Sequence, residues 1–134
     1  MDNKRIVSIV EDELDIAVLF YYVLRTIKEI QVFKFTDPIM ALGHIKINAK
    51  DYVLVISDLR MPVINGIQLL KTIKHLNPLT RTILTTAFLV EDNIFQEYLK
   101  NETINGFLQK PIELEQLLLE VNKQINFIEN VNII

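Results

Sequence analysis

The chain has 134 residues, which is enough for one domain and too few for two of ordinary size. Its net charge of −3 argues against a protein that binds nucleic acid directly, and the absence of cysteine excludes disulfides, thiol catalysis and thiolate metal sites. No stretch of the sequence is long and apolar enough to span a bilayer, and no signal peptide is evident, so we expect a cytoplasmic protein that does not contact membranes.

Ten elements are predicted along the chain, each from its apolar pattern. Short β-branched runs predict strands, and apolar residues spaced by three and four predict helices. In chain order they are a strand at 5–10, a helix at 14–30, a strand at 31–35, a helix at 38–48, a strand at 53–56, a helix at 66–76, a strand at 82–86, a helix at 90–99, a strand at 104–108 and a helix at 113–128. Asp12 is the expected N-cap of the first helix, and Asp37 followed by Pro38 the start of the second.

Strand and helix alternate five times in this order. Such alternation predicts right-handed crossovers and a parallel sheet that helices cover on both faces. Five units fit the α/β flavodoxin-like fold, a doubly wound (βα)5 parallel sheet of five strands in the order 2-1-3-4-5. The second strand alternates in polarity, which suits an edge of that sheet.

Chemically distinctive residues follow four of the predicted strands. They are Glu11 and Asp12 after the first, Asp58 after the third, Thr86 at the end of the fourth and Lys110 after the fifth. Ligands of an open parallel sheet bind beyond this edge, where the strand order reverses, so the three carboxylates should crowd there. Oxygen ligands favour Mg²⁺ first, then Mn²⁺ or Ca²⁺. Each residue taken singly is equally well a helix cap or a surface residue, and only their convergence predicts a site.

Four stretches in this order resemble the receiver domain of two-component response regulators, the chemotaxis-regulator-like fold. They are I-V-E-D-E after the first strand, D-L-R-M-P-V-I-N-G after the third, T-T-A-F after the fourth and G-F-L-Q-K-P across the fifth. The resemblance spans residues 4 to about 128. It implies a receiver domain at 1–129, followed by a C-terminal tail or linker stub at 130–134.

The resemblance implies roles for the site residues. Asp58 would accept a phosphoryl group from a sensor histidine kinase or a phosphotransfer protein. Glu11 and Asp12 would hold Mg²⁺ together with Asp58 and the backbone carbonyl of Arg60. Lys110 would pair with the phosphoryl group. Because it ends a strand at the same edge of the sheet, we also expect its ammonium near the Asp58 carboxylate.

Two further residues would relay the phosphorylation of Asp58 to the protein surface. The resemblance makes Thr86 the switch hydroxyl and Phe107 the switch aromatic. Phosphorylation would then change the surface of the fourth helix, fifth strand and fifth helix, and so control an effector protein or output domain. A homodimer that forms on phosphorylation fits the same picture.

Three positions depart from the common pattern of the family. Phe107 stands where many relatives have tyrosine, so it offers no hydroxyl. Arg60 and Phe88 lie two residues after Asp58 and Thr86, at positions that tune dephosphorylation in this family. Because Phe88 is bulky and carries no acid, we hypothesise that it shields the phosphoryl group and slows autodephosphorylation.

Other functions compete with the phosphorylated switch. A phosphorylation-independent pseudo-receiver, acting only as an interaction module, is the main alternative. A haloacid-dehalogenase-like phosphatase would need a second acid two residues after the nucleophile, where this chain has Arg60. A flavodoxin would need a phosphate loop where the acidic turn after the first strand stands. We therefore expect a signalling switch and not a metabolic enzyme.

Two features match no motif. His44 and His75 lie on predicted helices, and we expect both at the surface without a part in phosphotransfer. Residues 127–134 are more apolar than a free end requires. They predict an extension of the last helix, a dimer contact or the stub of a linker.

Overall fold

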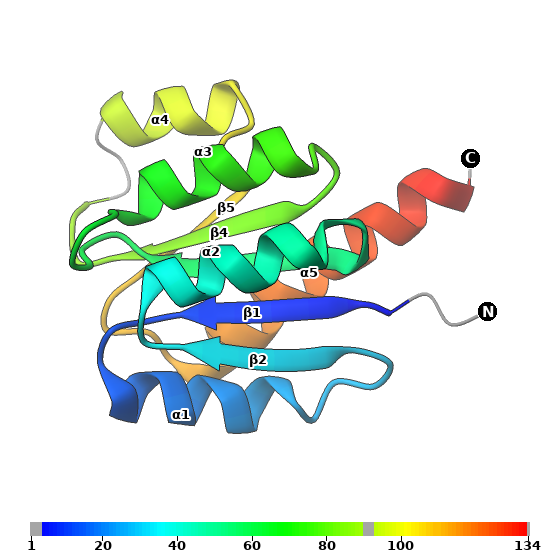
Figure 1. Cartoon of the computed structure of the whole chain (residues 1–134), viewed down its shortest axis with the longest axis horizontal. Helices are drawn as coiled ribbons and strands as arrows, with labels where there is room; N and C mark the ends of the chain where they lie inside the picture. The colour runs from blue at the N-terminus through cyan, green and yellow to red at the C-terminus, as the bar shows by residue number, and fades with distance from the viewer. Residues whose placement is uncertain (1–3, 90–92, 134) are drawn as a thin grey trace.

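A parallel β-sheet forms the middle layer of the protein, with helices on both faces (Figure 1). The computed structural model describes residues 4–89 and 93–133. Its strands are β1 (Ile6–Val10), β2 (Gln31–Phe35), β3 (Tyr52–Asp58), β4 (Arg81–Thr86) and β5 (Gly106–Gln109). They lie in the order β2-β1-β3-β4-β5, and every neighbouring pair is parallel. The predicted flavodoxin-like fold is confirmed, and β1 and β3 lie side by side.

Two apolar cores attach the helices to this sheet. The helices are α1 (Leu14–Leu24), α2 (Pro38–Ile47), α3 (Gly66–Leu76), α4 (Asn93–Lys100) and α5 (Leu114–Ile133), with a 3-10 turn, η1 (Ala49–Asp51), before β3. One core joins the sheet to α2, α3 and α4, and the other joins it to α1 and α5. Within β3, Val55 packs in the first core and Leu54 and Ile56 in the second, because side chains alternate along a strand. None of the helices in the described residues is long and apolar enough to cross a membrane.

Helix α1 is shorter than predicted. It ends at Leu24, whereas the apolar spacing predicted a helix to residue 30. The Thr26 hydroxyl donates to a carbonyl of the last turn at 2.7 Å, and Glu29 adopts a left-handed backbone with φ 68°. Ile27 and Ile30 still pack against the second core. The apolar spacing therefore continues past the end of the helix, because the turn into β2 is itself packed on the core.

The two predicted helix starts have different outcomes. Asp37 caps α2, since its carboxylate accepts a hydrogen bond from a backbone amide of the first turn at 2.9 Å, with Pro38 in the first helical position. Asp12 does not cap α1, so that prediction was wrong. The N-cap is Glu13, whose side chain makes no capping bond. The Glu13 amide instead donates to the carboxylate of Glu11 at 3.0 Å.

The bounds of several other elements also differ from the predicted ones. Strand β5 begins at Gly106 and not at 104, because the Asn105 side-chain oxygen accepts from the Thr82 amide at 3.0 Å and ties down the residue before the strand. Helix α5 continues past the predicted end at 128 to Ile133, through most of the predicted tail. The predicted start of the fourth helix, at residue 90, lies outside the described residues.

His44 is not the surface residue that we expected. Its ring is half-buried, with the centroid 4.4 Å from that of Phe33, and its Nδ1 lies 2.6 Å from the Tyr52 hydroxyl. That hydroxyl is also 2.5 Å from the Ser8 hydroxyl. The three polar side chains thus connect α2 with β3 and β1. Burial lowers the pKa of His44, and it raises the pKa of Tyr52 to about 12.

The half-buried imidazole of His44 should account for part of the protein's sensitivity to acid. The folded pKa of His44 is lowered, so the unfolded chain takes up this proton first as the pH falls below about 6.5. Its contribution to stability is complete above that pH and is lost as the pH falls through the folded pKa. In urea unfolding between pH 4 and 8, the unfolding free energy of His44→Gln should fall less than that of the wild type as the pH is lowered. The exposed His75, changed to Gln, is the control and should follow the wild type. If the unfolding free energies of the wild type and of His44→Gln fall in parallel as the pH is lowered, this histidine is not the cause of the acid sensitivity.

Candidate functional site

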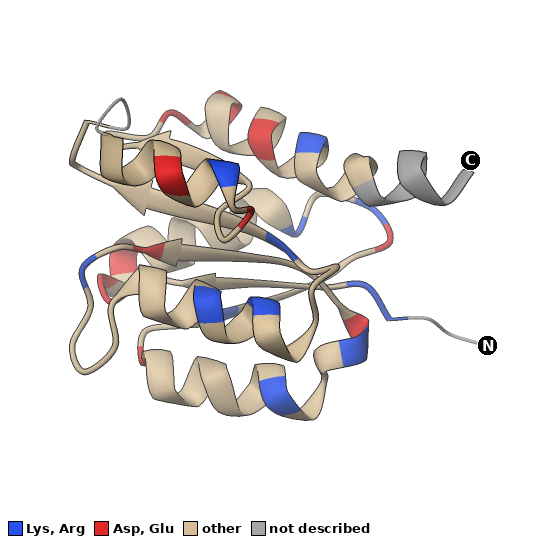
Figure 2. Ribbon diagram, turned by 90° about the horizontal axis from the view of Figure 1, so that it is seen from above, with Lys and Arg blue, Asp and Glu red and all other residues tan. Residues whose placement is uncertain are grey.

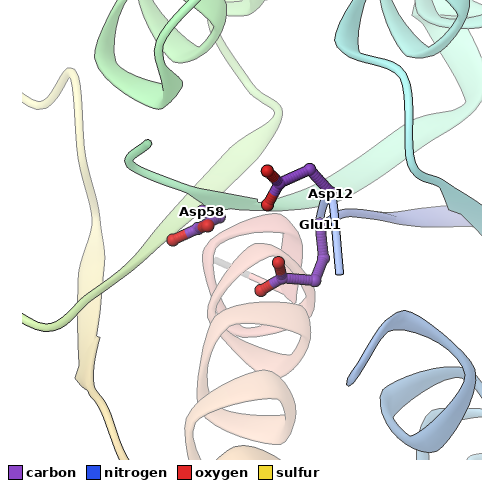
Figure 3. Close-up of side chains that lie close together, drawn as sticks. All are labelled: Glu11, Asp12 and Asp58. Atoms are coloured by element: carbon purple, nitrogen blue, oxygen red, sulfur yellow. The ribbon is translucent and has the colours of Figure 1, made fainter. Parts of the chain in front are cut away.

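Polar side chains converge at the carboxyl ends of the strands. In chain order they are Glu11 and Asp12 after β1, Asp58 at the end of β3, Thr86 at the end of β4 and Lys110 after β5. One oxygen from each of the three carboxylates lies within 4.8 Å of the other two. Figure 2 shows acidic residues at the arrowheads of the strands, and Figure 3 shows the three carboxylates together beyond β1 and β3. The predicted crowding of acids is therefore present.

Two of the three carboxylates are buried. Glu11 is 2 % exposed and Asp58 is 7 % exposed, whereas Asp12 is open to solvent. Burial raises the pKa of both Glu11 and Asp58, because a carboxylate is harder to ionise away from water. The charge of Asp58 raises the pKa of Glu11 further. Added positive charge would therefore stabilise this cluster.

Lys110 brings one positive charge to the cluster. Its Nζ lies 3.2 Å from Asp58 Oδ1 and 3.3 Å from Glu11 Oε1. Burial alone lowers the pKa of Lys110, but the two carboxylates outweigh it, so the pKa is raised. The contact with Asp58 was expected from the sequence. The contact with Glu11 was not, because no pattern pairs residues 99 positions apart.

Backbone contacts fix the position of Lys110. Its amide donates to the carbonyl of Thr86 at 2.7 Å, which ties the end of β5 to the end of β4. The Lys110–Pro111 peptide bond is cis. The ammonium thus enters the site from a strand end that is held on its neighbour.

The loop after β3 brings the start of α3 against Asp58. The Gly66 amide donates to the Leu59 carbonyl at 2.8 Å, and a Cβ on Gly66 would collide with the carbonyl oxygen of Asp58. Glycine is required here by close approach, not by an unusual φ. Asn65 and Gln68 cap α3 reciprocally, with bonds of 2.9 and 3.1 Å between each side chain and the other's amide. This capping box was not predicted, although the N-x-x-Q spacing signals it.

The same loop contains a tight, strained turn. Val63 has φ 72°, in the left-handed region that β-branched residues rarely adopt, and the Ile64 amide donates to the Pro62 carbonyl at 2.8 Å. The Val63 side chain is 85 % exposed, so packing does not explain its conformation. Strain of this kind clusters at functional sites.

An open pocket of about 550 Å³ joins these elements. It is lined by Asp12, Glu13, Asp58, Leu59, Arg60, Thr86, Ala87, Phe88 and Lys110. Glu11 reaches the site through its contact with Lys110. Thr86 is 1 % exposed, and its hydroxyl accepts a hydrogen bond from the Phe88 amide at 3.0 Å. The structure thus brings together six of the residues predicted from the sequence on one pocket wall.

Two residues of the pocket wall contact each other. The guanidinium carbon of Arg60 lies 4.6 Å from the centroid of the Phe88 ring, a cation–π distance. Arg60 comes from the loop after β3, and Phe88 from the loop after β4. Phe88 is 45 % exposed. This contact bridges the two loops beside the pocket, and it was not predicted from the sequence.

Phe107 lies apart from the pocket wall. It is half-buried on β5 and packs edge-to-face on Phe95 of α4, with the ring centroids 5.3 Å apart. Both rings belong to the core that carries α2, α3 and α4. Phe107 is therefore placed to couple β5 with α4.

The donors of the cluster fit a hard divalent cation. Glu11, Asp12 and Asp58 offer only carboxylate oxygens, and the exposed Asp12 leaves room for ion-bound water. Mg²⁺ prefers such oxygens and keeps several of its waters. These residues therefore suit Mg²⁺ or Mn²⁺, while the Arg60 carbonyl remains a predicted further ligand.

The family follows from a comparison with known proteins. The family model of the response regulator receiver domain matches residues 7–122. The chain belongs to the response regulator receiver family. Receiver domains are the signalling switches of two-component systems, and they typically bind Mg²⁺ at an acidic pocket and interact with histidine kinases and output domains. The family predicted from the motifs is confirmed.

Solved receiver structures share the fold of this receiver. One from Clostridium thermocellum has 23 % identity and a TM-score of 0.82, covering 95 % of this chain and 98 % of that chain. The signal receiver domain of a putative Luxo repressor protein from Vibrio parahaemolyticus has 22 % identity and a TM-score of 0.82, covering 97 % and 96 %. A CheY-like receiver protein from Methanospirillum hungatei has 19 % identity and a TM-score of 0.81, covering 95 % and 98 %. No curated protein matches this chain.

Proposed function

We propose that this receiver accepts a phosphoryl group on Asp58 from the phosphohistidine of a sensor kinase or a phosphotransfer protein, and thereby controls an effector protein or output domain. The position of Asp58 carries the proposal. Its buried carboxylate lines an open pocket, with the Lys110 ammonium 3.2 Å away and two more carboxylates beside it. A cytoplasmic location and a homodimer formed on phosphorylation belong to the same proposal.

The transfer itself needs position and charge more than covalent assistance. An Asp58 oxygen attacks phosphorus, the phosphorus–nitrogen bond of the donor breaks, and the electron pair stays on the departing imidazole. Lys110 holds the attacking carboxylate and offsets the negative charge that the phosphoryl group brings. Glu11, Asp12, Asp58 and the Arg60 carbonyl would hold Mg²⁺, which when bound offsets charge on phosphoryl oxygens.

The new phosphoryl oxygens would then draw in Thr86. Its hydroxyl oxygen accepts from the Phe88 amide, and its O–H can donate to an anionic oxygen. Movement of Thr86 and its loop would shift the packing of Phe107 on Phe95, and so the surface of α4, β5 and α5. Phosphorylation would bias a two-state equilibrium of this surface.

Acetyl phosphate tests the proposal without knowledge of the kinase. With Mg²⁺, the intact mass should rise by about 80 Da, and the gain should be absent in Asp58→Asn or with excess chelator. A receiver known to react serves as the positive control. If that receiver gains a phosphate under the same conditions and this chain does not, the pseudo-receiver alternative is correct.

The contact between Arg60 and Phe88 supports a slow loss of the phosphoryl group. Both side chains line the pocket, and together they bridge its two flanking loops. Hydrolysis needs a water molecule in line with the bond to Asp58. A bulky ring held by a cation limits access of that water, since displacing the pair costs about 1 kcal/mol.

Removal of the ring should therefore shorten the lifetime of the phosphorylated form. We expect Phe88→Ala to speed loss of the phosphate by roughly three- to tenfold. The decay is followed by intact mass after removal of excess donor. Leu89→Ala removes a neighbouring exposed side chain that does not line the pocket, and it should leave the decay unchanged. A phosphoryl half-life of only seconds in the wild type, unaltered by Phe88→Ala, would refute the shield.

A further inference from the structure

Lys74 lies on the last turn of α3, near the beginnings of β4 and β5 and away from the acidic pocket. Its half-buried ammonium donates to the side-chain oxygen of Asn105 at 2.7 Å. That oxygen also accepts from the Thr82 amide at 3.0 Å. Among the residues that the structure describes, no carboxylate forms an ion pair with Lys74. Its ammonium is therefore bound by an amide oxygen and not by a carboxylate in direct contact.

Two hollows open beside this side chain. They measure about 240 and 290 Å³ and share Lys74 and Thr103 in their walls. Arg81 and Glu102 also line the first hollow. Lys71 and His75 line the second. Lys74 thus stands between two openings to solvent, in surroundings where basic residues outnumber the single acid.

These surroundings make the ammonium of Lys74 unusually easy to deprotonate. Burial lowers its pKa most, and the Arg81 charge lowers it further, against the opposing effect of Glu102, to about 8. Near pH 7.5, Lys74 is then a neutral amine in roughly a quarter of the molecules, against about one molecule in a thousand for an ordinary lysine. The neutral amine is the nucleophilic form.

We propose that Lys74 is an acylation site, which reacts with acyl phosphates in preference to the exposed lysines of the chain. The positive charges of Lys71 and Arg81 beside the two hollows attract a donor that carries a doubly charged phosphate. The Lys74 nitrogen attacks the acyl carbon, and a carbon–nitrogen bond forms. The carbon–oxygen bond to phosphate breaks, phosphate leaves with the electron pair, and the proton of the amine passes to it. A neutral amide replaces the ammonium.

Acylation of Lys74 would change the hydrogen bonds at the Asn105 side-chain oxygen. The amide product keeps one N–H for the Asn105 oxygen but loses the charge that strengthens the bond. Asn105 also binds Thr82 at the start of β4, so the change would reach two strands. Lys74 is therefore a modification site independent of Asp58.

Acetyl phosphate and peptide mass spectrometry test the proposal. With chelator at pH 7.5, Lys74 should gain the acetyl group, about 42 Da, about tenfold faster than the exposed Lys28 and Lys50. Its rate should level off above pH 8, while the rates of the exposed lysines continue to rise. The preference should disappear in urea-unfolded protein. Acetylation of Lys74 no faster than that of Lys28 and Lys50, or with the same pH profile, would overturn the proposal.

Two variants separate this reaction from phosphorylation. Lys74→Arg keeps the positive charge but should lose the fast acetylation, and it should still gain the phosphate of about 80 Da when Mg²⁺ is present. Asp58→Asn should lose the phosphate and keep the acetylation of Lys74. Loss of the acetylation in Asp58→Asn would contradict the independence of the two sites.

Discussion

Replacing Gly66 by alanine is expected to cost about 3 kcal/mol of unfolding free energy, although it adds only one methyl group. The Cβ would collide with the backbone carbonyl oxygen of Asp58, and it would also press on the side chain of Leu84. Backbone cannot yield as a flexible side chain can, so α3 or the end of β3 must move. The same movement displaces Asp58, and we expect phosphorylation by acetyl phosphate to fall more than tenfold in the folded fraction.

The chain contains a matched control for this change. Gly43 lies within α2, and nothing stands within 4 Å of a Cβ added there. Gly43→Ala should therefore raise the unfolding free energy by about 0.5–1 kcal/mol, because alanine is the better helix former. Urea unfolding of both variants checks the pair. Equal effects of the two alanines would contradict the close approach at Gly66.

In metal-free solution, Asp58→Asn is expected to raise the unfolding free energy at pH 7 by about 1–3 kcal/mol. Burial raises the pKa of Asp58 in spite of Lys110, so the ionised carboxylate is a net cost to the folded state. The substitution also removes the charge that raises the pKa of Glu11. The residue proposed to carry the function thus destabilises the fold that holds it.

The pH dependence of this gain follows from the direction of the shift. The folded state binds the Asp58 proton before the unfolded state does, so the wild type grows more stable as the pH falls through the folded pKa toward 3.8. The advantage of Asp58→Asn should therefore be complete above the folded pKa and fade toward pH 4. Asp15→Asn, at an exposed position of α1, should differ little from wild type at any pH. A stability gain that is absent at pH 7, or that does not depend on pH, would show that the ionised Asp58 carboxylate does not destabilise the folded state.

The fold could be predicted from the sequence because its signals are local. Strands buried on both faces read as continuous apolar runs, and helices read as apolar residues three and four apart. Asp37 and Pro38 marked a helix start correctly. The predicted end of α1 was wrong. Ile27 and Ile30 lie in the turn after the helix, but they pack on the core and so continue the helical spacing of apolar residues.

The site could be predicted as a set of residues but not as a set of contacts. Topology alone places the ends of β1 and β3 together, so Glu11, Asp12 and Asp58 were expected to cluster. The capping role given to Asp12 failed, because Glu13 starts the helix and its amide binds the Glu11 carboxylate. No sequence pattern shows which of several neighbouring acids will bond to a given backbone amide.

Most contacts between distant segments could not be predicted. Lys110 was expected near Asp58, but its contact with Glu11 and the contact of Arg60 with Phe88 across two loops were not. His44 was expected at the surface, but it bonds to Tyr52 beneath α2. Each of these depends on side-chain directions that only the packed structure fixes.

Locating the phosphoryl group in the chain decides whether Asp58 is the residue that accepts it. After reaction with acetyl phosphate and Mg²⁺, borohydride reduces an aspartyl phosphate to homoserine, which peptide mass spectrometry can place. We expect homoserine at position 58 in the wild type and at no position in Asp58→Asn. Homoserine at position 12, a phosphate on a histidine, or a protein that gains no phosphate while a control receiver does, would contradict this expectation.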